Sequence, residues 1–257
     1  MKKMTKISLV IVISIIVFLL AIFYIKTFVN NFKSSSIVIG QKVSNKLIYD
    51  KTFDENFNEI TINAKASNIY IKESDTIKVM IYGKKNKTKV DANDKLTIKV
   101  DEIPCVGVCI NNTISKVEVY LPTLYQSIIN INNSSGEIKI EKFPNLIMKI
   151  NEDYGDVFIK EGYDISIKNN YGNIKINQIN NYLDIDESYG DIEIDNVNIN
   201  ENSHIKNNYG DINIGFTNKI YIDASTNLGS TKINNNYQKS DITLKLKNDY
   251  GDIIVKN

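Results

Sequence analysis

The sequence predicts an all-β protein: a β-solenoid of stacked two-strand repeats of about 19 residues, preceded by one N-terminal transmembrane helix. Three observations predict it. An uncharged apolar segment lies near the N-terminus, a glycine recurs at near-constant intervals from Gly136 onward, and apolar residues alternate with polar ones on both sides of that glycine. Alternation is typical of a strand with one buried face, and a constant period is typical of stacked repeats.

The apolar segment is residues 7–25, ISLVIVISIIVFLLAIFYI, which carries no charge. At 1.5 Å per residue it spans about 28 Å, close to the roughly 30 Å hydrocarbon core of a bilayer. The alternative is a cleaved signal peptide, whose apolar region is usually about 7–15 residues long and ends in a small-x-small site. This run is longer and leads into Phe23 and Tyr24, so we expect an uncleaved anchor.

Lysines set the expected orientation of this anchor. Lys2, Lys3 and Lys6 precede the span, and positively charged flanks stay cytoplasmic. Residues 1–6 are therefore expected to form a cytoplasmic tail, and residues 26–36, which end in a serine run, a stalk. The predicted location is the cell membrane, single-pass, with the C-terminal domain extracytoplasmic.

Residues 37–130 are expected to form an irregular N-terminal β region and cap. Short alternating segments such as FNEITINA and KLTIKV predict strands, but they show no constant period. A stack of repeats needs a covered end, because an open strand edge pairs with other chains.

Residues 131–257 hold seven regular repeats. Each contains a turn glycine, and the second and fourth residues after it, like those seven and five positions before it, are mostly apolar. The turn glycines are Gly136, Gly155, Gly172, Gly190, Gly210, Gly229 and Gly251. We expect glycine there because the corner needs either a positive φ or a close approach of two backbones.

Stacking explains why the copies resemble one another. In a solenoid each side chain lies against its counterpart in the next rung, so the same residue types recur at the same offsets. A β-sandwich of hairpins does not require this, although it remains the structural alternative.

The chain resembles the DUF4097 family of bacterial β-strand-repeat, adhesin-like proteins. The matching residues are Glu118-Val119-Tyr120-Leu121-Pro122, the stretch Asn132-Asn133-Ser134-Ser135-Gly136-Glu137-Ile138, and the Tyr-Gly-Asp-Ile turns at 189–192 and 209–212. The resemblance runs from about Phe57 to the C-terminus. It implies a β-solenoid in a bacterial cell envelope, and it implies neither a catalytic residue nor a ligand.

The composition argues against two classes of function. Lys and Arg number 31 against 30 Asp and Glu, so the basic surface that nucleic-acid binding needs is not expected. The one histidine, His204, lies in a polar strand-edge sequence, and acidic residues follow the repeat rather than interrupting it. We therefore expect no enzyme and no cofactor.

Cys105 and Cys109 form the sole cysteine pair. Outside the membrane so close a pair can oxidise, and we expect a local disulfide around Gly107. Two reduced, partly buried thiols are the alternative.

A tyrosine precedes most turn glycines. Tyr154, Tyr171, Tyr189, Tyr209 and Tyr250 would form a ladder on one edge of the stack, interrupted at Leu228. The flat rings are a candidate surface for a glycan or wall polymer. The alternative is that they shield the corner, as side-chain ladders do in any regular stack.

Acidic residues follow the same glycines. The column would hold Glu137, Asp156, Asp191, Asp211 and Asp252, with Asn173 and Ser230 intervening. Neighbouring coils are about 4.8 Å apart, so adjacent carboxylates would repel one another. Calcium would offset this repulsion, although capping of backbone N–H groups by the carboxylates explains the residues without a metal.

We expect a non-enzymatic, adhesin-like binding module that contacts cell-wall polymer or another envelope protein. The alternative is an envelope-stress sensor or signalling accessory that works through a partner membrane protein, since six cytoplasmic residues hold no output domain. The rung near Val255 is expected to leave an open edge through which copies self-associate.

Overall fold

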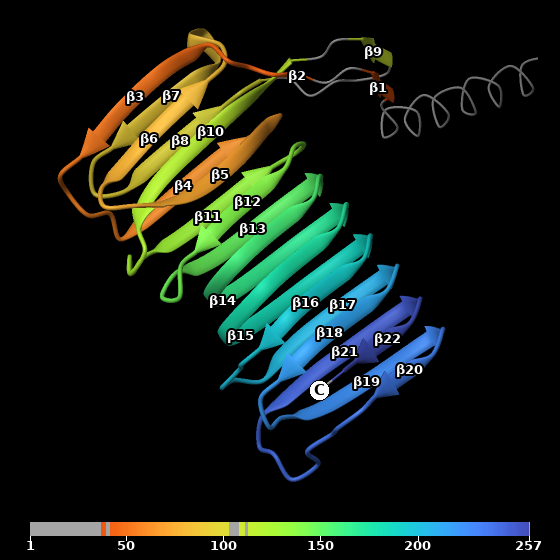
Figure 1. Ribbon diagram of the computed structural model, residues 1–257. Helices are drawn as coiled ribbons and strands as arrows, with labels where there is room; N and C mark the ends of the chain where they lie inside the picture. Colours follow the sequence, from red (N-terminus) through yellow and green to blue (C-terminus); the bar gives the residue numbers. More distant parts are fainter. Residues whose placement is uncertain (1–36, 40–41, 103–107, 111–112, 257) are drawn as a thin grey trace, which may run out of the picture. The chain divides into compact units, whose positions relative to one another are not determined.

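The computed structural model describes residues 37–39, 42–102, 108–110 and 113–256, which belong to two compact units (Figure 1). One unit comprises residues 1–42 and 105–112, the other residues 43–104 and 113–257. The predicted tail, membrane span and stalk lie outside the described residues, as does Cys105. Within the described stretches, no helix has the length and apolar content needed to span a membrane.

The first unit contributes two short strands to the described chain. β1 (Ile37–Ile39) and β9 (Val108–Ile110) pair in parallel, with Val38 opposite Cys109. The sequence did not predict this division, which separates residues 37–39 from the rest of the irregular N-terminal region.

The second unit holds the repeats. Its strands before the regular repeats are β3 (Leu47–Phe53), β4 (Glu59–Ala64), β5 (Ser67–Ser74), β6 (Ile77–Tyr82), β7 (Thr88–Ala92), β8 (Leu96–Val100) and β10 (Thr113–Pro122), with one 3-10 turn, η1 (Lys85–Lys87). The repeats follow as β11 (Ile128–Asn133), β12 (Ile138–Lys142), β13 (Ile147–Tyr154), β14 (Val157–Tyr171), β15 (Ile174–Tyr189), β16 (Ile192–Val197), β17 (Ser203–Tyr209), β18 (Ile212–Thr217), β19 (Tyr221–Leu228), β20 (Thr231–Ile233), β21 (Thr243–Tyr250) and β22 (Ile253–Val255). β2 (Lys42–Val43) straddles the two units.

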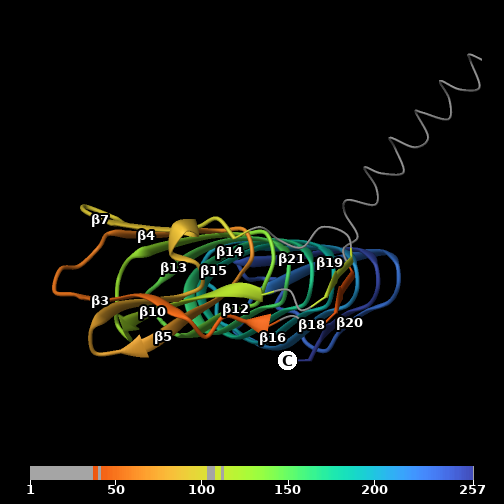
Figure 2. The ribbon, with the colours of Figure 1, turned by 90° about the horizontal axis from the view of Figure 1, so that it is seen from above.

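The repeats stack as successive coils, and this confirms the predicted all-β class and the predicted stacking. Equivalent residues of neighbouring coils pair in parallel: Ile150 lies opposite Ile167, which lies opposite Ile185. The glycine turns separate the two strands of each coil and fall at one edge of the stack (Figure 1). Viewed from above, the coils superpose around a common interior (Figure 2).

The interior is made of the alternating apolar residues that the sequence singles out. Ile138, Ile140 and their counterparts through Ile214 are fully or almost fully buried, and they belong to one continuous core. Because a β-branched side chain packs well on a pleated surface, columns of isoleucine fill the space between the two faces of each coil.

The turn glycines satisfy both reasons given for them. Gly172 has φ = 140°, a conformation that side-chain-bearing residues rarely adopt. At Gly155 and Gly190 the close approach of two backbones requires glycine, because a Cβ there would overlap the carbonyl oxygen of the turn glycine in the preceding coil.

The N-terminal end of the stack combines parallel and antiparallel pairs. β4 and β5 pair in parallel with β11 and β12, and β8 and β10 continue the stack beyond them. Two strands then run against the direction of the stack: β7 pairs antiparallel with β8, and β6 pairs antiparallel with β10. β3 in turn pairs antiparallel with β6. These antiparallel strands interrupt the parallel edge on which another coil would otherwise stack.

At the other end the order of coils in space departs from the order in sequence. β21 pairs with β17 on one side and with β19 on the other, and β22 lies between β18 and β20 in the same way. The prediction that the rung near Val255 forms the open end is therefore wrong. Val255 is buried between Ile214 and Ile233, and the outermost coil is β19–β20.

This order predicts a specific cross-link. Asn213 and Ile254 are outward-facing partners on neighbouring strands, whereas Lys232 lies one coil farther away. Parallel neighbours are about 4.8 Å apart, within the Cα range of a disulfide, and next-nearest strands are not. With cysteines at 213 and 254 we expect oxidation to give a bridge, detected by mass spectrometry of proteolytic fragments. A second variant, with Asn213→Cys and Lys232→Cys, should form no such bridge. A bridge in that second variant would mean that the coils stack in chain order.

Candidate functional site

The five turn tyrosines form one continuous stack. Neighbouring ring centroids lie 4.7–4.9 Å apart and the ring planes are within 3° of parallel. The order of coils places Tyr250 directly after Tyr209, so Leu228 ends this tyrosine ladder instead of interrupting it. Each ring is 42–46% exposed, which makes the ladder an aromatic surface at the turn edge of the stack.

The stacking changes which parts of the rings a ligand can reach. Because each inner ring lies parallel to a neighbour on both sides, its flat faces are largely covered. The exposed parts are ring edges and hydroxyl groups, repeated once per coil. The idea that the ladder binds through flat faces is therefore wrong for the inner rings, and a partner would meet a row of hydroxyls instead.

The acidic column beside the ladder is held by the backbone. Each Oδ1 accepts a hydrogen bond from the main-chain N–H one coil away: Asp191 from Asp211, at 2.8 Å, and Asp211 from Asp252, at 2.8 Å. Asn173 does the same for Asp191, so an amide oxygen serves as well as a carboxylate. These bonds account for the column without calcium, and the described residues contain no cluster of three or more metal-ligating side chains.

A buried polar column runs inside the stack, just behind the ladder, and the sequence reasoning missed it. Its members stand three residues before each turn glycine: Asn133, Glu152, Asn169, Glu187, Asn207, Asn248 and Thr226. The first six are at most 4% exposed. The alternation already gave a signal, because three, five and seven residues before the glycine share one parity and so one face.

The amides of this column tie the coils together at the turn. Asn207 Nδ2 donates to the carbonyl of Gly190 at 2.9 Å, and Asn248 Nδ2 donates to that of Gly210 at 2.8 Å. Each bond crosses from one coil to the glycine of the adjacent coil. The turn that carries each tyrosine is therefore fixed from inside, which keeps the rings in register.

Two members of the column are acids in an apolar setting. Burial raises the pKa of the Glu152 carboxyl to about 8 and that of Glu187 to about 7, because the ionised form loses its hydration. Hydrogen bonds offset part of this: Asn133 Nδ2 donates to Glu152 and the Tyr189 N–H donates to Glu187. When protonated, these acids resemble the neighbouring asparagines in having a proton to donate.

The other predicted positions show no assembled chemistry. His204 is half-buried on β17, between Asp184 and Lys245 on the adjacent strands. Cys109 lies in β9, and the predicted disulfide with Cys105 falls outside the described residues.

The family can now be stated from comparison with known sequences. A profile of the family described as Toastrack DUF4097 matches residues 57–257, which include the whole ladder and most of both β regions. The chain belongs to the Toastrack DUF4097 family. No curated protein matches it.

Solved structures of two bacterial proteins resemble this chain. A candidate adhesin from Bacteroides fragilis NCTC 9343 is 21% identical, with a TM-score of 0.50, and the alignment covers 84% of this chain and 99% of that one. A candidate cell adhesion protein from Clostridium sporogenes ATCC 15579 is 15% identical, with a TM-score of 0.41, over 82% of this chain and 99% of the other. At this identity the likeness concerns the fold of the Toastrack domain alone.

Proposed function

We propose that this Toastrack protein is a non-enzymatic, adhesin-like module of the bacterial cell envelope, and that it binds its partner along the tyrosine ladder. The observation that carries the proposal is five stacked, exposed tyrosines at one edge of the coils. The fold is shared with proteins described as candidate adhesins. Residues 7–25 would anchor the module in the membrane, with the ladder outside.

The ladder restricts the chemistry of the partner. Phenol hydroxyls both donate and accept hydrogen bonds, and here they repeat every 4.7–4.9 Å. Carboxylates flank them, from Asp153 and Asp249 on one side and the Asp156–Asp252 column on the other. A polyanion would be repelled by these flanks, so a neutral or cationic wall polymer fits better.

The proposal predicts that hydroxyl removal abolishes binding to cell walls. In the triple variant Tyr171→Phe, Tyr189→Phe and Tyr209→Phe the rings still stack, so the fold is retained while three hydroxyls are lost. We expect at least a tenfold drop in the fraction of full-length protein, kept in mild detergent, that sediments with isolated bacterial cell walls.

Tyr237→Phe is the matched control, since Tyr237 is 41% exposed and lies outside the ladder. It should sediment like the wild type. Equal sedimentation of the triple variant and the wild type would contradict binding through the ladder. Absence of wall binding by the wild type would contradict the wall as partner.

A further inference from the structure

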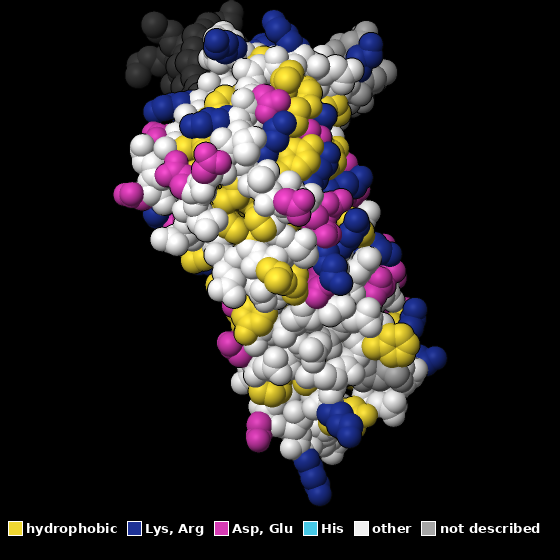
Figure 3. All heavy atoms as spheres, turned by 60° about the vertical axis from the view of Figure 1, so that its left-hand side comes forward, with side chains coloured by type: hydrophobic (Ala, Val, Ile, Leu, Met, Phe, Trp, Pro, Cys, Tyr) yellow, Lys and Arg dark blue, Asp and Glu magenta, His cyan; other side chains and the backbone are white. Residues whose placement is uncertain are grey.

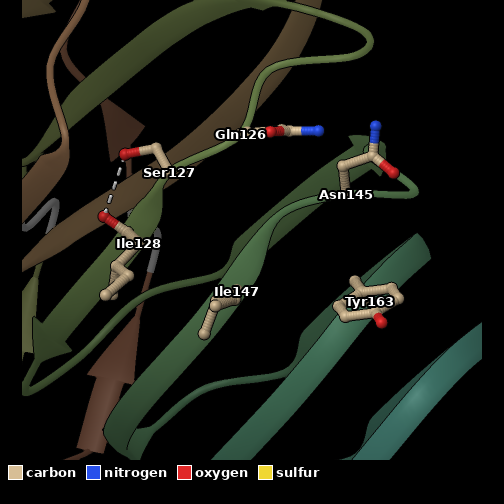
Figure 4. A pocket seen from close by; sticks show the side chains of 6 residues that line it. All are labelled: Gln126, Ser127, Ile128, Asn145, Ile147 and Tyr163. Atoms are coloured by element: carbon tan, nitrogen blue, oxygen red, sulfur yellow. Dashed lines mark hydrogen bonds between the residues drawn. The ribbon is translucent and has the colours of Figure 1, made fainter.

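A hollow lies away from the tyrosine ladder, beside the starts of β11 and β13 and the middle of β14 (Figure 4). It encloses about 500 Å³ and is lined by Gln126, Ser127, Ile128, Asn145, Ile147 and Tyr163. We refer to it as the corner groove. Tyr154 lies seven positions after Ile147 along β13, so the corner groove lies roughly 23 Å from the tyrosine ladder.

The floor of the corner groove is apolar. Ile128 and Ile147 are partners on neighbouring strands, and both are half-buried on the outer face of the sheet. Tyr163 stands beside them and is 39% exposed. Two aliphatic side chains and one aromatic ring therefore offer a surface on which the C–H groups of a ligand can pack.

The rim of the groove is polar and unsatisfied. The side chains of Gln126, Asn145 and Tyr163 come from three successive corners (Figure 4). Within the described part of the chain, none of their amide or hydroxyl groups has a hydrogen-bond partner, whereas Ser127 Oγ is occupied by the carbonyl of Phe57 at 2.9 Å. Two amides and a phenol supply donors and acceptors together.

The groove has a fixed shape and no free strand edge. The N–H of Ile147 donates to Ser127 O at 3.1 Å and the N–H of Tyr163 donates to Leu146 O at 3.3 Å, so these main-chain donors are already used. A peptide that added as a strand would need such groups. Recognition is therefore left to side chains, which suits a ring-shaped ligand with a polar periphery.

None of the lining side chains carries a charge. The carboxylates opposite the two isoleucines on neighbouring strands are occupied: Glu59, opposite Ile128, pairs with Lys95, and Asp164, opposite Ile147, accepts from Asn181 at 2.8 Å. On the face that Figure 3 shows, charged side chains lie mostly toward the N-terminal coils, and uncharged side chains cover most of the remainder. An anionic headgroup or phosphate finds no cation in the groove.

We propose that the corner groove binds an uncharged sugar ring of a glycan. A pyranose has a C–H face for Ile128, Ile147 and the Tyr163 ring, and a hydroxyl or acetamido rim for the two amides. This site is separate from the tyrosine ladder and does not rest on the function proposed for the ladder.

The test is calorimetric titration of the full-length protein with two neutral probes, chitohexaose and cellohexaose. The first offers acetamido groups to Gln126 and Asn145, the second hydroxyls only. We expect at least one probe to bind, and Tyr163→Ala and Gln126→Ala each to weaken that binding tenfold or more. Gln126 is exposed and makes no side-chain hydrogen bond in the described structure, so its variant tests the groove even if Tyr163→Ala fails to fold.

Tyr237→Ala serves as the matched control and should bind like the wild type. Failure of both probes to bind overturns the inference. So does binding that survives both groove variants. If that binding is instead lost in the triple phenylalanine variant, the sugar sits on the ladder: the groove inference fails while the proposed function stands.

Discussion

Replacing Gly172 with alanine is expected to lower the free energy of unfolding by about 3–5 kcal/mol. Gly172 has φ = 140°, which an alanine adopts only with strain. In addition, the new Cβ would overlap the main-chain carbonyl of Gly155, so two coils must separate for it to fit. Chemical denaturation followed by far-UV circular dichroism measures the loss.

Gly229→Ala is the comparison that tests the reason. Gly229 also has a positive φ, 154°, and a Cβ there would overlap the carbonyl of Gly251. It belongs, however, to the outermost coil, which has a neighbour on one side and can shift outward. We expect a loss at least 1 kcal/mol smaller than for Gly172→Ala. Equal losses would show that the clash between coils contributes little.

Stability is expected to fall as the pH rises from about 4.5 to about 8. The pKa values of Glu187 and Glu152 rise on folding from 4.5 to about 7 and about 8, so the folded state holds protons that the unfolded chain releases. The stabilisation is complete below about pH 4.5 and is lost through the folded-state pKa values. At 1.36 kcal/mol per pH unit, Glu187 alone contributes on the order of 3 kcal/mol.

Glutamine tests this explanation, because it has the shape of the protonated acid and carries no charge. Glu187→Gln should raise the free energy of unfolding at about pH 8.5 and flatten its dependence on pH. Glu193→Gln is the control: Glu193 has a half-exposed side chain paired with Lys175, and its loss should change stability by less than about 1 kcal/mol. A Glu187→Gln protein with unchanged pH dependence would locate the effect elsewhere.

Much of the fold could be predicted because each coil repeats the same spacing of apolar residues around a turn glycine. Residues such as Ile174 and Ile192 fall at the same offset from a glycine, and stacking is the arrangement that buries all of them at once. The order of the last two coils could not be predicted by counting, since β19 and β21 share the same inward parity.

Composition, however, gave a usable signal for that order. The copy around Gly229 carries Ala224 where the others carry isoleucine or leucine, Thr231 where they carry isoleucine or valine, and Leu228 where five of them carry tyrosine. Its inward side chains bury less apolar area, so less is lost when this copy occupies the exposed end.

The candidate sites were predictable to different degrees. The tyrosine ladder follows from spacing alone, because rings at one offset must stack when coils stack. The corner groove does not. Gln126 and Asn145 both stand ten residues before a turn glycine, but Tyr163 stands nine before Gly172, and spacing alone does not show that the three side chains line one hollow. Their lack of internal partners is a property of the folded chain that no pattern of residues reveals.

The exchanged position of the last two coils affects how the protein can be completed during synthesis. Ribosomes deliver β19–β20 before β21–β22, yet the later pair lies nearer the middle of the stack. If coils were added one at a time from the N-terminus, β19–β20 could not pair with its final neighbours, β21–β22, until those strands emerge. Residues 234–242 connect β20 back to β21. We therefore expect the last two coils to form together, late in folding, rather than one after the other.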